Sequence, residues 1–275
     1  MAKASEKKRS VIAGLDIGTT KVAIVVATIN QTSGQNSHQT SHQINGHSEF
    51  EIVGVGSAIN TGVRQGVVVN IESTTEAIKK AREEAELMSG YPIDEVWVGV
   101  AGSHISSFDS KGMVAIRNKE VGQEDIDRVL EAAKAVAVPS DREVIHVLPR
   151  EYKVDEQEGI SDPIGMSGVR LEASVHIVTG GRTALQNAIK CTEKANLKVA
   201  GLVLQQLASS LAVLSEDEKN LGVAVVDMGG GTSDIVLYVN GSVAHTAVVP
   251  IGGNHFTHDI AVGLRTPQSS AEELK

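Results

Sequence analysis

Two short segments of the chain have the residue types of phosphate-binding turns. They are Asp16–Lys21 (DIGTTK) and Asp227–Asp234 (DMGGGTSD), and each begins at the end of an apolar run. A glycine-rich turn between strands lets backbone N–H groups approach an anion without obstruction by Cβ, and threonine and serine hydroxyls add donors. The aspartate would repel a bare phosphate, but it fits if Mg²⁺ and its water shell lie between them. The two segments therefore predict a site in which nucleotide phosphates are held between two hairpins.

Other chemistries for these turns are less well supported. A single Asp-x-Gly turn is typical of many hairpin tips, but two of them, each after an α/β half, indicate a duplicated domain pair. A Walker-type or dinucleotide-binding fold is the alternative, yet G-x-x-x-x-G-K-[ST] is absent and the turns lead to strands rather than helices. Cys191 falls within a helical pattern and no G-x-S-x-G segment occurs, so nothing supports a covalent nucleophile.

The elements that position the first turn are strands followed by a helix. Apolar runs at 11–17 and 22–29 predict a hairpin around the turn, and further strands are expected at 52–58 and 67–71. Ser73 and Glu76 have capping-box spacing ahead of a helical stripe, and Gly90 is a natural stop for that helix.

The segment from Tyr91 to about Val178 predicts a small α+β module inserted into a larger fold. Its last strand alternates strictly from Val169 to Ile177, as expected for a sheet with one buried face. The other expected elements are strands at 95–101, 113–117 and 144–154 and a helix at 124–137.

Alternating helices and strands return before the second turn. The expected elements are helices at 183–195 and 205–214, strands at 198–204, 221–226, 235–239 and 243–249, and a short helix from Gly252-Gly253 to near Arg265. Asn240-Gly241 is a strong two-residue hairpin signal. Ser269 and Glu272 again have capping-box spacing, so 271–275 resembles the first turn of a helix that does not continue. We therefore expect the sequence to be a fragment of a longer protein.

Composition places the 275 residues in the soluble globular class, with 41% hydrophobic and 21% charged residues. A net charge of -9 and an aromatic fraction of 3% argue against nucleic acid as a partner. The single cysteine indicates a reducing, cytosolic compartment, and no run approaches the about 20 apolar residues of a membrane span. The polar stretch Gln31–Ser48 reads as a loop insertion, and its histidines (His38, His42 and His47) fit a solvated tract better than a metal site.

At the level of the superfamily, the two turns resemble the phosphate-1 and phosphate-2 hairpins of actin, Hsp70 and the sugar kinases. Within it, several further segments look like the FtsA family of bacterial cell-division proteins. They are Val98–Phe108 (VGVAGSHISSF), His146–Pro149 (HVLP), Gly165–Glu172 (GMSGVRLE), Leu207–Ser210 (LASS) and Glu216–Glu218 (EDE). The resemblance runs from about Val11 to Lys275, interrupted mainly by the polar insertion.

The resemblance implies an α/β, actin-like fold. This fold is a duplicated pair of ribonuclease-H-like domains with an inserted small α+β subdomain, and the chain would be cut off within the second half of the pair. Residues 11–90 and 180–215 would form subdomain 1A, 91–179 the inserted subdomain 1C, and 216–275 the beginning of 2A. It also implies an ATP-binding protein that polymerises, tethers the FtsZ ring to the cytoplasmic face of the inner membrane at the septum, and recruits later division proteins through 1C. The main FtsZ-binding surface in 2B and the amphipathic membrane helix would lie after Lys275.

The resemblance also assigns roles to residues of the two turns. Asp16 would hold the Mg²⁺ water shell, with Asp227 as the second acidic residue near the metal. Gln205 would orient the attacking water, although a polar residue at a helix start is an equally good reading. The residues that would bind the phosphates of ATP are Gly18, Thr19, Thr20 and Lys21 on one side and Gly229, Gly230, Gly231 and Thr232 on the other.

Two other functions use the same fold. A sugar or acetate kinase would share the phosphate-binding turns, but it needs a general-base carboxylate in a substrate pocket, and none is evident in the sequence. A pilus-assembly scaffold would use the fold to bind proteins. The FtsA-like reading predicts at most a weak ATPase, with a mainly structural and recruiting role.

Overall fold

The computed structural model describes residues 10–31, 43–44 and 48–275. Most of the Gln31–Ser48 insertion, including His38, His42 and His47, lies outside the described residues. The chain divides into two compact units, and each is considered by itself. The first comprises Met1–Arg64, Val68–Gly99 and Asn187–Leu202, and the second comprises Gln65–Val67, Val100–Gln186 and Val203–Lys275.

The first unit is built on a six-stranded sheet with the order β12-β7-β1-β2-β4-β3. Its strands are β1 (Ser10–Ile17), β2 (Lys21–Gln31), β3 (Gln43–Ile44), β4 (Ser48–Ile59), β7 (Glu95–Val100) and β12 (Lys198–Leu204). β1, β2 and β4 form an antiparallel meander, whereas β7 pairs in parallel with β1. Alternate residues of β1 and β2, such as Leu15 and Ile24, are buried, so the pleat turns one apolar face toward the core.

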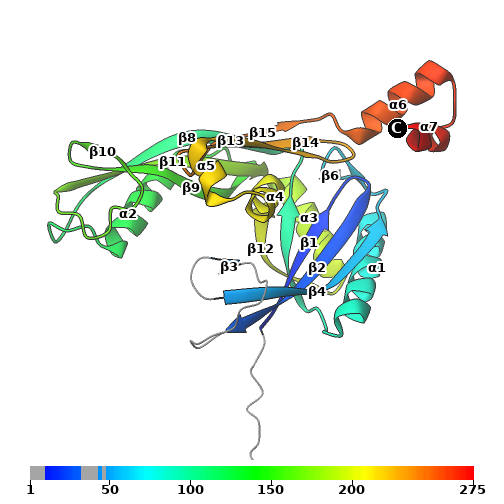
Figure 1. Ribbon diagram of the computed structural model, residues 1–275, viewed down its shortest axis with the longest axis horizontal. Helices are drawn as coiled ribbons and strands as arrows, with labels where there is room; N and C mark the ends of the chain where they lie inside the picture. Colours follow the sequence, from blue (N-terminus) through cyan, green and yellow to red (C-terminus); the bar gives the residue numbers. More distant parts are fainter. Residues whose placement is uncertain (1–9, 32–42, 45–47) are drawn as a thin grey trace, which may run out of the picture. The chain divides into compact units, whose positions relative to one another are not determined.

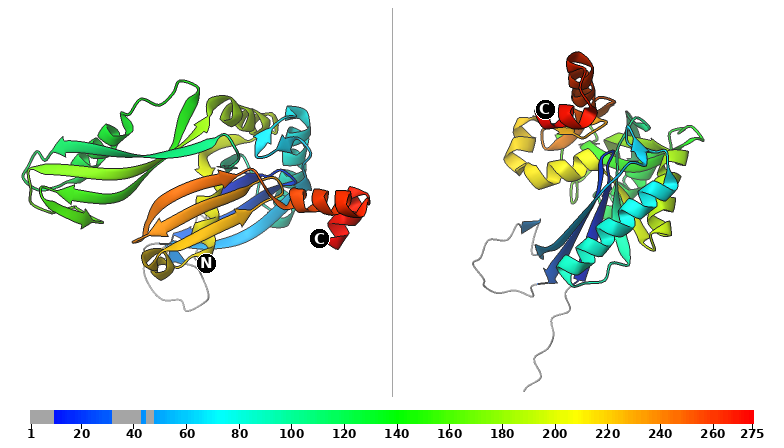
Figure 2. Two further views of the ribbon diagram at one scale, coloured as in Figure 1. Left: turned by 90° about the horizontal axis from the view of Figure 1, so that it is seen from above. Right: turned by 90° about the vertical axis from the view of Figure 1, so that its right-hand side faces the viewer.

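Helix α1 (Ile71–Ser89) lies along this sheet (Figure 1) and buries Ile78, Ala81 and Ala85. It approaches β4 closely because that strand presents glycine there: a Cβ on Gly56 would collide with the Ala81 carbonyl oxygen. A β-strand glycine at such a point marks the close approach of another backbone. The right-hand view of Figure 2 shows α1 beside the strands of this sheet.

The second unit contains the inserted sheet, with the order β10-β9-β11-β8. Its strands are β8 (Ile105–Ala115), β9 (Arg142–Val154), β10 (Gln157–Ile160) and β11 (Arg170–Gly181). Helix α2 (Gln123–Lys134) packs on one face and buries Val129 and Ala133 against a cluster that includes Leu171 and Val175. The predicted alternation is confirmed for Leu171, Ala173, Val175 and Ile177, which are buried, whereas Val169 precedes β11 and is exposed.

The second unit also contains a three-stranded antiparallel sheet, β13 (Val223–Met228), β14 (Ser233–Val239) and β15 (Ser242–Val249). Asn240 and Gly241 both have positive φ in the β14–β15 turn, which confirms the predicted hairpin. β15 leads into α6 (Gly253–Leu264) and α7 (Gln268–Leu274), as the left-hand view of Figure 2 shows. The remaining elements are α3 (Arg182–Lys194), α4 (Gln205–Val213), α5 (Glu216–Leu221) and the two-residue strands β5 (Val63–Arg64) and β6 (Val67–Val68).

Several expected elements differ from the structure. The strand expected at 113–117 is the longer β8, which begins at Ile105, and the strand expected at 221–226 is β13, because Leu221 ends α5. The strand at 95–101 was assigned to the inserted module, but β7 pairs with β1 in the first sheet. The expected strand at 67–71 is only Val67–Val68, because Asn70 caps α1 and its side chain accepts a hydrogen bond from the Ser73 amide, so Ser73 lies inside the helix. The last helix begins at Gln268, after Pro267, and not at 271.

The contact between α1 and β4 yields a stability prediction. Gly56→Ala should lower the free energy of unfolding by about 2 to 3 kcal/mol, because the added methyl group overpacks the helix backbone. Gly14→Ala is the control, since a Cβ on Gly14 of the same sheet meets no atom within 4 Å. Urea denaturation measures both, and equal stability of the two variants would contradict this packing.

Candidate functional site

The first turn links β1 to β2 within the first unit. The Gly18 amide donates to the Lys21 carbonyl at 3.0 Å, which closes the turn. A Cβ on Gly18 would lie 2.8 Å from that carbonyl oxygen, so the position requires glycine. Asn60, which directly follows β4 and is only 3% exposed, fixes the turn: its side-chain Nδ2 donates to the Gly18 carbonyl at 2.8 Å, and its amide donates to the Thr20 carbonyl at 2.9 Å. Sequence reasoning missed Asn60, whose only signal is its place after a strand.

The second turn links β13 to β14 within the second unit. The Gly229 amide donates to the Thr232 carbonyl at 2.9 Å. The start of α6 holds the other side, because the Gly253 amide donates to the Gly229 carbonyl at 2.9 Å and the Asn254 amide to the Gly230 carbonyl at 2.8 Å. Within the described residues, the amides of Gly230 and Gly231 have no hydrogen-bond partner. Two neighbouring amides of this kind can donate to an anion.

The two turns repeat one local geometry. In each, an aspartate lies two residues before a glycine whose amide donates to the carbonyl three residues further on. Asp16 stands opposite Ala23, and Asp227 stands opposite Asp234.

Asp227 and Asp234 make the second turn strongly acidic. They are direct partners across the β13–β14 ladder, and side chains in such pairs lie on the same face about 5 Å apart. Asp234 is only 4% exposed, and its Oδ2 accepts a hydrogen bond from the Thr232 hydroxyl at 3.0 Å. Burial, reinforced by the charge of Asp227, raises the pKa of Asp234 to about 6, while the Thr232 hydroxyl and the nearby Gly102 amide act in the opposite direction. Sequence reasoning placed Asp234 in the motif but gave it no role.

This acidic pair fits a divalent cation. Oδ1 of Asp234 is buried and has no hydrogen-bond partner among the described residues, so a positive charge there would satisfy it. Two carboxylates are also the number expected for Mg²⁺, which keeps several waters and takes further oxygen ligands from phosphates. No group of three or more histidine, cysteine, aspartate or glutamate side chains that could hold a metal occurs in the part of the chain that the structure describes.

Helix α4 brings further polar groups to the second turn. Gln205 is its first residue, and Ser209, one helical turn later, donates from Oγ to Asp227 Oδ2 at 2.5 Å. The Leu204 amide, just before the helix, donates to Nε2 of His146 on β9 at 3.0 Å. Burial lowers the pKa of His146, which keeps this ring nitrogen available as an acceptor. Neither Ser209 nor His146 has a local sequence signal for this role.

The predicted site residues thus fall into two groups. Asp16, Gly18, Thr19, Thr20 and Lys21 share the first turn, in the first unit. The second unit brings together Asp227, Gln205 and the glycine turn, all on or beside β13 and α4. The group of the second turn is Gln205, Asp227, Gly229, Gly230, Gly231 and Thr232.

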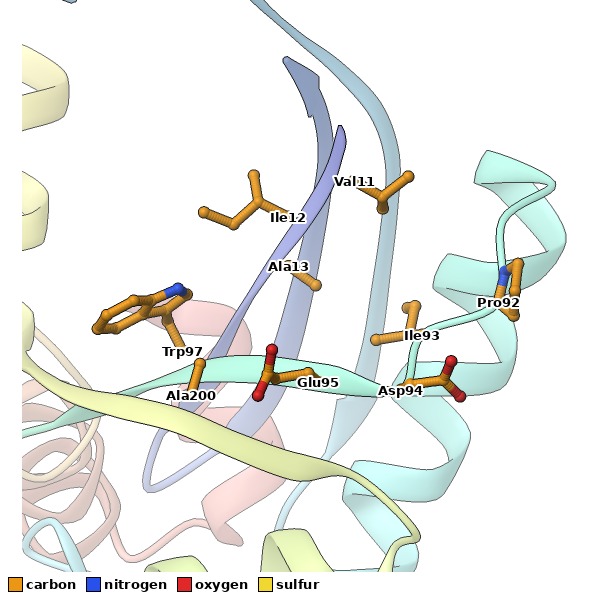
Figure 3. A pocket seen from close by; sticks show the side chains of 9 residues that line it. All are labelled: Val11, Ile12, Ala13, Pro92, Ile93, Asp94, Glu95, Trp97 and Ala200. Atoms are coloured by element: carbon orange, nitrogen blue, oxygen red, sulfur yellow. The ribbon is translucent and has the colours of Figure 1, made fainter. Parts of the chain in front are cut away.

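A cavity of about 230 Å³ in the first unit lies away from its turn. Its walls come from the opposite end of β1, from β7 and β12, and from the segment before β7, with the Trp97 ring beside Ile12 (Figure 3). Asp94 and Glu95 line it as well. Apolar walls with carboxylates disfavour a phosphate there, so this cavity is not the nucleotide site.

The raised pKa of Asp234 predicts a pH-dependent stability. Folding raises this pKa from 3.8 to about 6, so ionising Asp234 lowers the stability of the folded state. This loss of stability is absent below about pH 4, grows up to pH 6 and is complete above pH 6. Without metal or nucleotide, Asp234→Asn should therefore raise the free energy of unfolding by about 1 to 3 kcal/mol at pH 7.5, with little change at pH 4. Urea denaturation at both pH values measures this.

The exposed Asp217 of α5 provides the control. Asp217→Asn should change the stability by less than about 0.5 kcal/mol at either pH. A loss of stability in Asp234→Asn at pH 7.5 would contradict the assignment of Asp234 as an uncompensated carboxylate.

Comparison with solved structures defines the class of fold. The chain superimposes on a protein of the "PilM-PilN type IV pilus biogenesis complex" with a TM-score of 0.65 and 18% identity, covering 98% of this chain and 70% of that one. The ethanolamine utilization protein EutJ from Carboxydothermus hydrogenoformans gives a TM-score of 0.51 at 17% identity, covering 97% and 61%. With the α/β sheets and the inserted module, these likenesses show an actin-like fold, which confirms the predicted fold class.

Sequence comparison narrows the class to a family. Residues 102–179 match "SHS2 domain inserted in FTSA" and residues 224–275 match "Cell division protein FtsA". Cell division protein FtsA of Pseudomonas aeruginosa is 48% identical over 272 residues, which cover 99% of this chain and 62% of that protein. FtsA of Escherichia coli is 42% identical over 275 residues, covering 100% and 61%. Over the part that it spans, the chain belongs to the FtsA family of cell division proteins.

The chain spans about three-fifths of the length of these relatives. Among the described residues, no helix combines the length and apolarity needed to cross a membrane.

Proposed function

We propose that this protein is an ATP-binding, filament-forming member of the FtsA family, and that both turns bind the phosphates of Mg-ATP. The observation that carries the proposal is the buried Asp234, paired across the ladder with the partly exposed Asp227, beside two glycine amides without partners. Anion donors next to uncompensated carboxylates suit a phosphate group only together with a cation. A metal-bound nucleotide supplies both charges at once.

Each residue of the two turns has a role in this proposal. Asp16 and Asp227 hold the water shell of Mg²⁺, and Asp234 adds negative charge behind Asp227. Gly18, Thr19, Thr20 and Lys21 bind the β- and γ-phosphates from one turn, and Gly229 to Thr232 bind them from the other. Gln205 orients a water for slow hydrolysis, so the protein is at most a weak ATPase. The bound Mg²⁺ supplies charge neutralisation of the phosphates.

Family membership is the support for the proposed cellular role. We propose that the protein polymerises, links the FtsZ ring to the cytoplasmic face of the inner membrane at the septum, and recruits later division proteins. Residues 91–179 are the proposed recruiting subdomain 1C, and 102–179 match the inserted SHS2 domain. In this scheme 11–90 with 180–215 form subdomain 1A, and 216–275 begin 2A.

A pilus-type scaffold is the second candidate, because the fold of the PilM–PilN protein matches most of the chain. At 18% identity that likeness concerns the fold alone, whereas the FtsA relatives reach 48%. Fluorescence imaging separates the two functions. A division protein should follow FtsZ to midcell and leave when FtsZ is depleted, and a midcell position independent of FtsZ would contradict the proposed role.

The nucleotide site is tested by Asp16→Ala in the full-length protein. The variant should lose Mg-ATP binding, by a factor of about 10² or more in Kd, because the metal water shell loses its acceptor. Isothermal titration calorimetry measures the affinity. Asp94→Ala, at the far cavity of the same unit, is the matched control and should bind as wild type does. Unchanged affinity in Asp16→Ala would rule out this site.

A further inference from the structure

The LASS segment of α4, Leu207–Ser210, contains two adjacent serines with different partners. Ser209 Oγ donates to Oδ2 of Asp227 at 2.5 Å. Ser210 is fully buried, and its Oγ lies 2.6 Å from the Tyr238 hydroxyl and donates to the Leu207 carbonyl at 2.7 Å. The Ser209 hydroxyl therefore bonds to the acidic end of β13, whereas the Ser210 hydroxyl bonds within the buried core.

The helix that carries these serines is firmly held. Leu204 and Leu207 belong to a core cluster with Val236 and Tyr238 of β14. The Leu204 amide is bonded to His146, so the beginning of α4 is fixed as well. A side chain on such a helix can hold its partner in one orientation, because the donor itself has little freedom to move.

Ser209 is placed to orient the carboxylate of Asp227. A hydroxyl that donates to a carboxylate at this distance forms a strong, charge-assisted hydrogen bond. Because the bond engages Oδ2, the Oδ1 atom keeps its lone pairs for another donor, such as a metal-bound water. The carboxylate would otherwise rotate to reduce its repulsion with Asp234 on the neighbouring strand.

The i, i+4 spacing joins Ser209 to Gln205. Residues four apart lie on the same face of a helix, so the face that meets Asp227 also carries Gln205 one turn earlier. The same face of α4 thus carries the candidate water-orienting residue, Gln205, and the serine that bonds to the candidate metal-binding carboxylate.

We propose that Ser209 is a positioning residue that orients the Asp227 carboxylate for Mg²⁺, whereas Ser210 has only a structural role. This inference rests on the proposed Mg-ATP site and adds to it a residue that touches neither nucleotide nor metal. Hydrogen-bonding partners of metal-binding groups commonly change metal affinity by 10- to 100-fold when they are removed.

The experiment measures, in the full-length protein, the Mg²⁺ concentration that gives half-maximal binding of a fluorescent ATP analogue. Ser209→Ala should require about tenfold more Mg²⁺ than wild type, because Asp227 loses its fixed orientation. Ser209→Thr keeps the hydroxyl and should restore the wild-type value to within about threefold. Ser210→Ala is the matched control: its melting temperature should fall, while its Mg²⁺ requirement stays that of wild type.

The outcomes separate this inference from the proposed function. If wild type binds with Mg²⁺ and Ser209→Ala has the same requirement, Ser209 does not position Asp227 and the inference is overturned, while the site stands. If wild type shows no Mg²⁺-dependent binding, both are overturned. A thermal melt checks that each variant folds. If Ser209→Ala does not fold, Ser209→Cys replaces it, because cysteine is similar in size to serine but a weak hydrogen-bond donor. Ser209→Cys should then show the same increase in the required Mg²⁺ concentration.

Discussion

The repulsion between Asp227 and Asp234 is the constraint on which the second turn depends. The ladder of β13 and β14 places the two carboxylates opposite each other, and burial keeps water from screening the inner one. A fold selected for stability alone would replace one of them by a neutral residue. The pairing of the two carboxylates, the unpartnered oxygen of Asp234 and the two glycine amides beside them together indicate a turn that is complete only when a cation and an anion are bound.

The first turn obeys the same backbone rule with different supports. In both, a glycine amide bonds to the carbonyl three residues on, which sets the turn just beyond the aspartate. The first is fixed by the buried Asn60, which directly follows β4, and the second by the start of α6. Because the turn geometry is the same and the supports differ, the requirement lies in the turn itself. This is the pattern expected of two halves that bind one kind of ligand.

Local patterns in the sequence predicted the hairpins, the turns and most of the helices, because glycine, asparagine and apolar alternation act over a few residues. Pairing between distant segments was not accessible in this way. β7 has the same apolar alternation whether it joins the inserted module or the first sheet, and only its parallel register with β1 decides. The start of α1 was misplaced because Ser73 and Glu76 imitate a cap, while Asn70 forms it. The acidity of Asp234 and the role of Ser209 depend on burial and on contacts across the fold, which spacing along the chain does not encode.

The central claim is that the turns need metal and nucleotide together, and thermal melting at pH 7.5 tests it most directly. A ligand that binds only the folded state raises stability by RT ln(1 + [L]/Kd). The account predicts a clear rise in melting temperature of the full-length protein with saturating Mg-ATP, and a much smaller rise with ATP and a chelator. Equal melting curves with and without Mg-ATP, on a cooperative transition, would contradict it.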